Sequence, residues 1–157
     1  MKKKIFAILL CLVSIFMVTG CGDKMTHIEG KLEELMTKVY DGIKEEELPM
    51  MLQNIELTEE DIEYFIGTKD IKWKEAIASE SGIGSIAHSV VLIRMDENVS
   101  QKDIDDAKTK IKENANPRKW LCVEAENVSV ESNGDLIILI MSDAKAETLK
   151  TNFSKLK

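Results

Sequence analysis

Cys21 is the residue of this sequence whose neighbours most directly indicate a chemistry. It follows Val18, Thr19 and Gly20, and an aliphatic residue and two small residues before a cysteine form the lipobox pattern. The thiol of Cys21 can accept a diacylglyceryl group as a thioether, and the small residues give a peptidase access to the Gly20–Cys21 bond. The sequence therefore predicts cleavage before Cys21 and a lipid anchor on its sulfur.

The residues before Cys21 support this interpretation. Lys2, Lys3 and Lys4 form a basic start, and residues 5–18 form an apolar run of 14 residues. Such a run is shorter than the roughly 20 apolar residues of a membrane-spanning helix and is typical of a secretory signal. We expect a removed signal peptide over residues 1–20 and a lipidated cysteine with a short tether over 21–24. The domain over 25–157 is then held on the extracytoplasmic face of the cell membrane. An ordinary cleaved signal with an incidental cysteine is the alternative.

Residues that suit hydrolysis are few. A hydrolase would have to use Ser81 or Ser85 as nucleophile and His88 as base, and nothing else in the sequence favours that arrangement. A hydrogen-bonded or exposed strand histidine is the simpler interpretation of His88. The glycines between Ser81 and Ser85 resemble a phosphate-binding loop, but such a loop requires a helix after it and a strand is expected here. We expect a hairpin loop and no catalytic residue.

Metal-binding patterns are not evident either. His27 and His88 have no paired spacing, and the acidic runs at Glu45–Glu47 and Glu59–Asp61 lack the alternating oxygen ligands and the glycine of a calcium loop. These runs are expected to be solvated, so we expect no metal and no cofactor. Cys122 lies in an apolar run and is expected to be a buried core residue.

Trp73 and Trp120 are the largest apolar side chains, and each has basic neighbours in sequence. Anchoring of the core is the default interpretation of both. A tryptophan at the rim of a surface, flanked by cations, would instead mark a contact surface. Both residues are therefore candidates for a contact surface.

Charge and length limit the class of protein. The net charge is −7, and removal of residues 1–20, which carry three lysines and no acidic residue, makes it −10. An acidic surface repels nucleic acid, which we do not expect as a partner. The remaining 137 residues suffice for one domain with its own core. The oligomeric state is left open.

Hydrophobic spacing predicts four helices. The first carries an apolar stripe from Ile28 to Ile43, with Thr26 and Glu29 at capping-box spacing and a regular start just after Gly30. A shorter amphipathic piece surrounds Pro49. The other helices are expected to begin at Thr58 (ending at Gly67), at Ser100 with Asp103 in its cap (ending before Pro117), and at Ser142.

Four strands are expected. Residues 71–79 alternate imperfectly, with Ile71, Trp73 and Ile77 on one face, and the apolar run in residues 87–95 suits a central strand covered on both faces. Leu121, Val123 and Ala125 begin a third strand with a bulge near Asn127. Asn133-Gly134 marks a hairpin to a fourth strand over residues 136–141. The prediction is an α+β domain that has an antiparallel sheet of three to four strands with helices packed on it, in the order α-α-β-β-α-β-β-α.

The sequence resembles an uncharacterised family of small lipoproteins from low-GC Gram-positive bacteria that carry a single domain of unknown function. The lipobox, residues 57–64, the strand run of residues 89–95 and residues 133–144 carry the resemblance, which covers roughly residue 35 to the C-terminus. This chain is shorter around residues 114–120. The resemblance implies the fold and the location, and it brings no site residues.

The leading functional hypothesis is a membrane-anchored, non-catalytic module that binds an envelope protein or another envelope component. An accessory lipoprotein that binds a solute for a transporter is the alternative, although two-lobed receptors generally need more than one domain of this size. The hydrolase described above is the third hypothesis.

Overall fold

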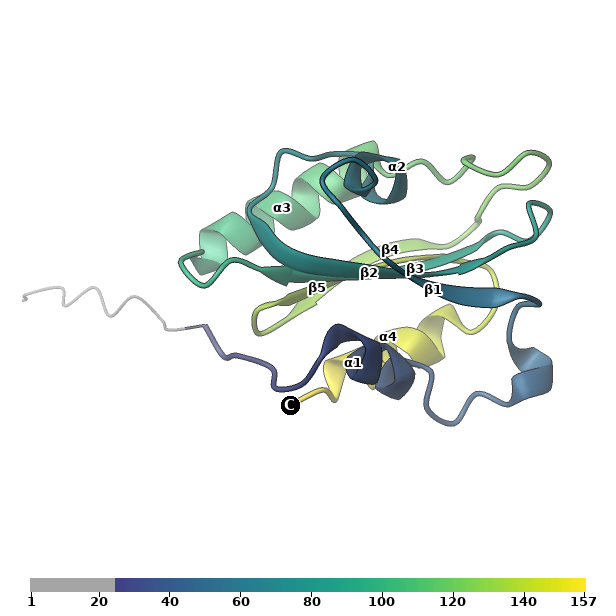
Figure 1. Cartoon of the computed structure of the whole chain (residues 1–157), viewed down its shortest axis with the longest axis horizontal. Coiled ribbons are helices and arrows are strands. Elements are labelled where there is room, and N and C mark those ends of the chain that lie inside the picture. The colour runs from purple at the N-terminus through teal and green to yellow at the C-terminus, as the bar shows by residue number, and fades with distance from the viewer. Residues whose placement is uncertain (1–24) are drawn as a thin grey trace, which may run out of the picture.

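The computed structural model describes residues 25–157 (Figure 1). The predicted signal peptide, Gly20, Cys21 and the tether lie outside these residues. The elements in chain order are α1 (Leu32–Val39), the short 3-10 helix η1 (Glu45–Glu47), β1 (Leu52–Glu56), α2 (Ile62–Ile66), β2 (Trp73–Ser81), β3 (His88–Met95), α3 (Gln101–Asn114), β4 (Val128–Asn133), β5 (Leu136–Ser142) and α4 (Ala146–Ser154).

The strands form one sheet in the order β1-β2-β3-β5-β4, and every neighbouring pair is antiparallel. The α+β class is therefore confirmed, whereas the number of three to four strands and the element order are wrong. The additional strand is β1, where the sequence suggested only an amphipathic piece around Pro49. Its five residues are too few to show the two-residue alternation of a strand, and this segment becomes a strand because it pairs with β2.

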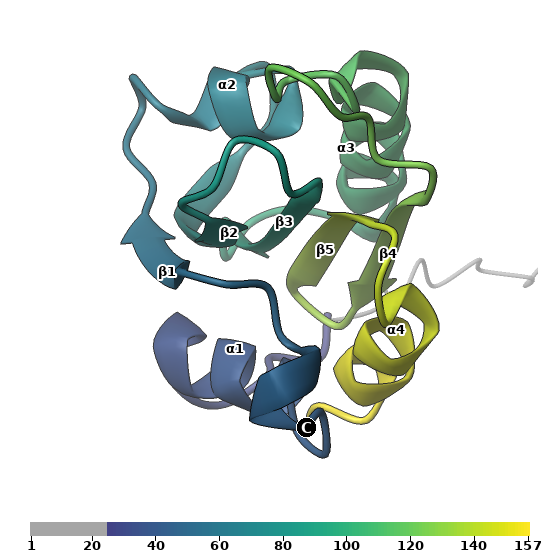
Figure 2. The ribbon, with the colours of Figure 1, turned by 90° about the vertical axis from the view of Figure 1, so that its right-hand side faces the viewer.

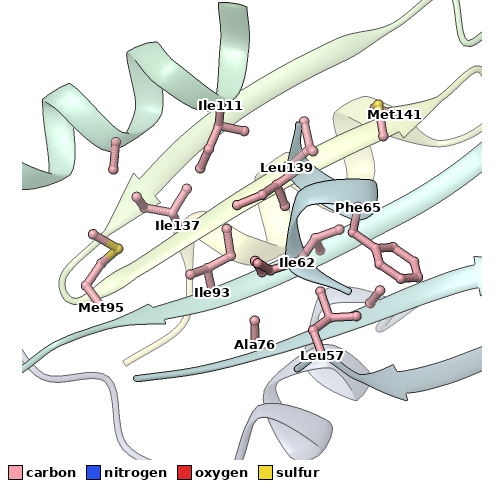
Figure 3. Packing of buried hydrophobic residues seen from close by; sticks show 14 of the residues in the cluster. Leu57, Ile62, Phe65, Ala76, Ile93, Met95, Ile111, Ile137, Leu139 and Met141 are labelled. Atoms are coloured by element: carbon pink, nitrogen blue, oxygen red, sulfur yellow. The ribbon is translucent and has the colours of Figure 1, made fainter. Parts of the chain in front are cut away.

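Helices cover both faces of the sheet (Figure 2). Helices α2 and α3 pack on one face and form the α2/α3 core, and α1 and α4 pack on the other and form the α1/α4 core. The central strand β3 is fully buried and alternates between them, with Val91 and Ile93 in the α2/α3 core and Val90 and Leu92 in the α1/α4 core. Figure 3 shows how the side chains of the α2/α3 core interlock. The prediction of a central strand covered on both faces is confirmed.

A bulge in β2 corrects the predicted face of Ile77. Trp73 lies opposite Met95 and Glu75 lies opposite Arg94, so one residue is inserted between the two pairs. The insertion reverses the side-chain alternation, because successive strand residues point to opposite faces. Trp73 packs against the α2/α3 core, whereas Ile77 belongs to the α1/α4 core.

The predicted strand from Leu121 to Ala125 is also wrong. Residues 115–127, between α3 and β4, contain no strand, so no bulge near Asn127 exists. Ala125 is buried and its N–H donates to the Pro117 carbonyl oxygen at 2.9 Å, whereas Leu121 is 93 % exposed. This hydrogen bond folds the segment back on itself, and its exposed residues can satisfy their backbone groups with water instead of the sheet.

The helix ends agree in part with the sequence. Ser100 and Asp103 form the predicted capping box of α3, Gly67 ends α2 in the left-handed conformation, and α1 begins after Gly30. Thr26 and Glu29 cap no helix, because they lie in a coil and α1 begins only at Leu32. Residues 58–61 form a turn before α2. Ser142 is the last residue of β5 and not the cap of α4.

Candidate binding groove

Exposed apolar side chains gather at one end of the domain. Strand β1, helix α2 and the 115–127 segment each contribute one, and Ile55, Tyr64 and Leu121 are 37 %, 58 % and 93 % exposed. These three side chains line a common groove of about 360 Å³, which we call the distal groove. Its other lining residues are Gln53, Phe65, Glu80, Ser81, Gly82, Gly84, Lys119 and Trp120.

The distal groove lies far from the start of the described chain. In Figure 1 the purple coil that precedes α1 is at the left, whereas the loop between β2 and β3 and the 115–127 segment are at the right. Both of these right-hand segments line the groove, through Gly82, Gly84 and Leu121. Isolated exposed apolar residues are ordinary on a protein surface, but a contiguous group around a hollow is typical of an interaction site.

A buried lysine lies in the wall of the groove. Lys119 Nζ donates to Glu80 Oε2 at 2.9 Å and to Ser89 Oγ at 3.1 Å, and the lysine side chain is only 2 % exposed. Burial lowers the pKa of Lys119, and the hydrogen bond to Glu80 opposes that shift. The ion pair therefore ties the 115–127 segment to the end of β2.

Three aromatic rings surround the same ammonium group. Nζ of Lys119 lies 4.4 Å from the ring centroid of Phe65, 4.9 Å from that of Tyr64 and 5.4 Å from that of Trp120. These are cation–π distances, and the faces of the rings already contact a cation of the chain itself. What the groove offers a ligand is accordingly its apolar rim, formed by Ile55, Leu121 and the outer edge of Tyr64.

The two tryptophans predicted as a contact surface are not brought together. Trp120 is 8 % exposed and lines the groove, next to the Ser81–Ser85 loop that the sequence singled out. Its Nε1 has no hydrogen-bond partner among the described residues. Trp73 begins β2 at the opposite end of that strand and is half-buried against the α2/α3 core. Only Trp120 belongs to the candidate site.

The hydrolase candidates are not arranged for attack. Ser81 Oγ donates to the Met50 carbonyl oxygen at 2.9 Å and accepts from the N–H of Ile83, so it holds a turn. The loop that follows is a hairpin connection between β2 and β3, as predicted. The hydrogen bonds of His88 are made with Tyr40 and Ser142 and with neither Ser81 nor Ser85.

His88 lies in a buried chain of hydrogen bonds, and the donor and acceptor of each bond can be assigned. Ser142 Oγ donates to the Ala144 carbonyl oxygen at 2.9 Å, so it accepts the proton of His88 Nδ1 at 2.8 Å. Nε2 of His88 then accepts from the Tyr40 hydroxyl at 2.7 Å. This assignment makes the imidazole neutral, and burial lowers the pKa of His88 to about 4 and raises that of Tyr40.

Sequence reasoning placed Cys122 in the core, and this is wrong. Its side chain is exposed, because it belongs to the irregular 115–127 segment and not to a strand. The acidic runs are solvated, as expected: Glu45–Glu47 and Glu59–Asp61 are all exposed. Within residues 25–157 no three His, Cys, Asp or Glu side chains are placed so that they could hold a metal ion.

A larger cleft of about 710 Å³ lies at the other end of the sheet, between the N-terminal coil and the turn after β3. Its most distinctive group, the Arg94 guanidinium, already donates to Glu75, to Asp135 and to the backbone. A ligand anion would therefore have to displace a partner that is already present. We regard this cleft as part of the scaffold.

No family model, no curated protein and no solved structure matches this chain. The helices of residues 25–157 include none that is long and apolar enough to cross a lipid bilayer. Residues 25–157 define a class by their fold alone, which is a five-stranded antiparallel sheet with two α-helices on each face.

Proposed function

We propose that this chain is a lipid-anchored, extracytoplasmic module that binds a protein partner through the distal groove. The observation that carries the proposal is the exposed apolar rim formed by Ile55, Tyr64 and Leu121 around a structured hollow. Burial of such side chains contributes about 25 cal/mol per Å² of apolar surface, so they favour association with a complementary surface.

The anchor and the groove are compatible in position. A tether over residues 21–24 reaches at most about 3.5 Å per residue, so the domain would start close to the bilayer. The groove lies at the end opposite the coil that continues from this tether (Figure 1). A domain held by Cys21 therefore presents the groove away from the lipid, where an envelope protein can reach it.

The anchor is tested with cells that express the chain and incorporate radiolabelled palmitate. The expected result is label on the wild-type chain and none on Cys21→Ser, with the variant released from the membrane fraction. Equal labelling of both chains, or membrane retention of the variant, would contradict the anchor. The test does not involve the groove, so the two parts of the proposal are judged separately.

The partner is tested by photo-crosslinking in intact cells. A photoreactive phenylalanine analogue replaces Leu121 in one strain and Lys112, an exposed residue of α3, in a matched strain. A discrete crosslinked species from position 121 that is missing from position 112 supports the groove. The same species from both positions, or none from position 121, would overturn the proposal.

A further inference from the structure

We infer that β1 is an open edge to which an extended, basic peptide segment of the partner adds as a sixth strand. This inference rests on the proposed function and names the kind of partner segment that the distal groove accepts. It follows from the direction of the β1 backbone groups, from the hollows on both sides of the strand, and from the charge around it.

The backbone of β1 has one side without partners. Met51 O accepts from Gly82 N at 3.0 Å, and Leu57 N donates to Ala76 O at 2.9 Å. Hydrogen bonding to a neighbour alternates along an antiparallel strand, so these two residues fix which backbone groups face β2. The N–H and C=O groups of Leu52, Asn54 and Glu56 point outward, and no other described strand pairs with β1.

The two edges of the sheet differ. Strand β4 is the other edge, and both α3 and α4 pack along it. No described helix packs closely along β1, which Figure 2 shows at the left margin of the sheet. Natural edge strands are usually protected by lysine, proline, a bulge or a covering element, and the sequence LQNIE contains neither lysine nor proline.

Hollows lie on both faces of this edge. The side chains of Gln53 and Ile55 point to the distal groove, and those of Leu52 and Asn54 line a second hollow of about 480 Å³ on the α1 side. Side chains of an added strand alternate in the same way, so one set would enter the distal groove and the other the α1-side hollow. Backbone pairing and two side-chain sites are thus available together.

The charge of the surroundings selects the partner. Residues 41–66, which contain β1 and both of its flanks, carry nine acidic side chains and one lysine. Asp41 lines the α1-side hollow, and Glu45 and Glu46 of η1 lie exposed just before β1, whereas Glu47 of the same helix is paired with Lys145. The distal groove has an apolar rim instead. The segment that fits has apolar side chains toward the groove and lysine or arginine toward α1.

A second copy of this chain fits less well. Edge-to-edge pairing of two β1 strands would bring the two acidic regions together, and like charges across an interface disfavour association. Pairing with a basic segment neutralises the same region. The basic peptide is therefore the occupant that we propose.

The test uses the mature chain in detergent and a synthetic peptide of about ten residues that alternates lysine and valine. Residue-resolved amide exchange by NMR is expected to slow on the order of tenfold at Leu52, Asn54 and Glu56 when this peptide is added, because their N–H groups gain partners. The matched peptide with glutamate in place of lysine should leave these rates unchanged. Protection by both peptides, or by neither, would overturn the inference.

Two proline variants locate the binding edge. Asn54→Pro removes an outward N–H of β1 without removing a bond to β2, and Ser132→Pro makes the same change at an outward position of β4. The first variant should lose peptide binding by tenfold or more and the second should keep it. Retained peptide binding by Asn54→Pro would contradict peptide addition at β1. So would a wild-type chain that forms dimers and an Asn54→Pro variant that does not, because β1 would then pair with a second copy.

A charge variant remains informative if proline unfolds the edge. Replacing Glu45 and Glu46 by glutamine should weaken the lysine peptide and reduce the salt dependence of its binding, whereas replacing the exposed Asp105 and Glu113 of α3 should not. Equal effects of the two pairs would overturn the role of the edge.

If the peptide does not bind but position 121 crosslinks a partner, the inference fails and the proposed function stands. If both fail, both are withdrawn.

Discussion

Arg94 Nη1 donates to Asp135 Oδ2 at 2.8 Å, which joins the end of β3 to the turn between β4 and β5. The same guanidinium donates to the carbonyl oxygens of Ile28 and Gly30, each at 2.8 Å, and to Glu75 Oε1 at 2.7 Å. The arginine side chain is only 4 % exposed. One buried cation therefore holds the N-terminal coil, through which the anchor would act, against the sheet.

Arg94→Ala is expected to lower the free energy of unfolding by about 3 to 5 kcal/mol, because it leaves buried acceptors without a donor. Chemical denaturation measures this change. Amide exchange at Ile28, whose N–H donates to Asp135, should rise more than exchange in α3. As a control, Arg118→Ala removes an exposed pair with Glu124 and should cost less than about 1 kcal/mol. Equal costs for both would mean that Arg94 does not hold the coil.

The buried His88 predicts how stability depends on pH. Its pKa is about 4 in the folded chain and 6.5 as the ordinary value, so the unfolded chain takes up the proton first as the pH falls. Stability from this residue is complete above pH 6.5 and decreases toward pH 4, by about 3 kcal/mol in total. Carboxylates whose pKa is lowered, such as that of Asp70, change the stability only at lower pH.

Denaturation at several pH values between 7 and 5 tests this dependence. The wild-type chain should lose stability across that interval, and His88→Gln, which cannot titrate, should show a much smaller slope. The variant is expected to be less stable at pH 7, because the hydrogen bonds to Tyr40 and Ser142 are disturbed, so the slope is the decisive quantity. Parallel slopes for the two chains would refute the role of His88.

Local signals in the sequence predicted those features that local chemistry determines. The capping box of Ser100 and Asp103, the left-handed Gly67 and the Asn133-Gly134 hairpin depend on residues within a few positions of one another. The apolar run from Val90 to Ile93 predicted a strand buried on both faces, because successive side chains of such a strand enter two apolar cores in turn.

Features that depend on distant partners were not predictable. The β2 bulge, which moves Ile77 to the other core, is defined by the register against β3. Leu121, Val123 and Ala125 alternate like a strand, but the segment folds back on itself through the hydrogen bond from the Ala125 N–H to the Pro117 carbonyl oxygen, and β4 pairs with β5 instead. The groove joins β1, α2 and residues 115–127, and only Trp120 and the Ser81–Ser85 loop pointed to it in the sequence.

Gly134 and Gly42 form a matched pair for testing how the N-terminal coil is fitted. Both have a positive φ, of 55° and 73°, so alanine is strained at either position. A Cβ on Gly134 would also collide with the Thr26 carbonyl oxygen, whereas nothing lies near a Cβ on Gly42. Gly42→Ala should cost about 1 to 2 kcal/mol and Gly134→Ala a further 1 to 3 kcal/mol. Thermal unfolding of both variants measures the difference. Equal losses of stability would show that the coil at Thr26 is not packed tightly against the turn at Gly134.

The thiols of the mature chain provide a test that joins the anchor to the groove. Cys122 is exposed beside Leu121, so it should react with a maleimide in the native chain nearly as fast as in the unfolded chain. If the signal is removed and the Cys21 sulfur carries lipid, Cys122 is the single reactive thiol, and mass spectrometry should find one adduct per chain. Partner binding at the groove should then slow this labelling. A second adduct would contradict lipidation of Cys21, and labelling that requires denaturant would contradict the exposed position of Cys122.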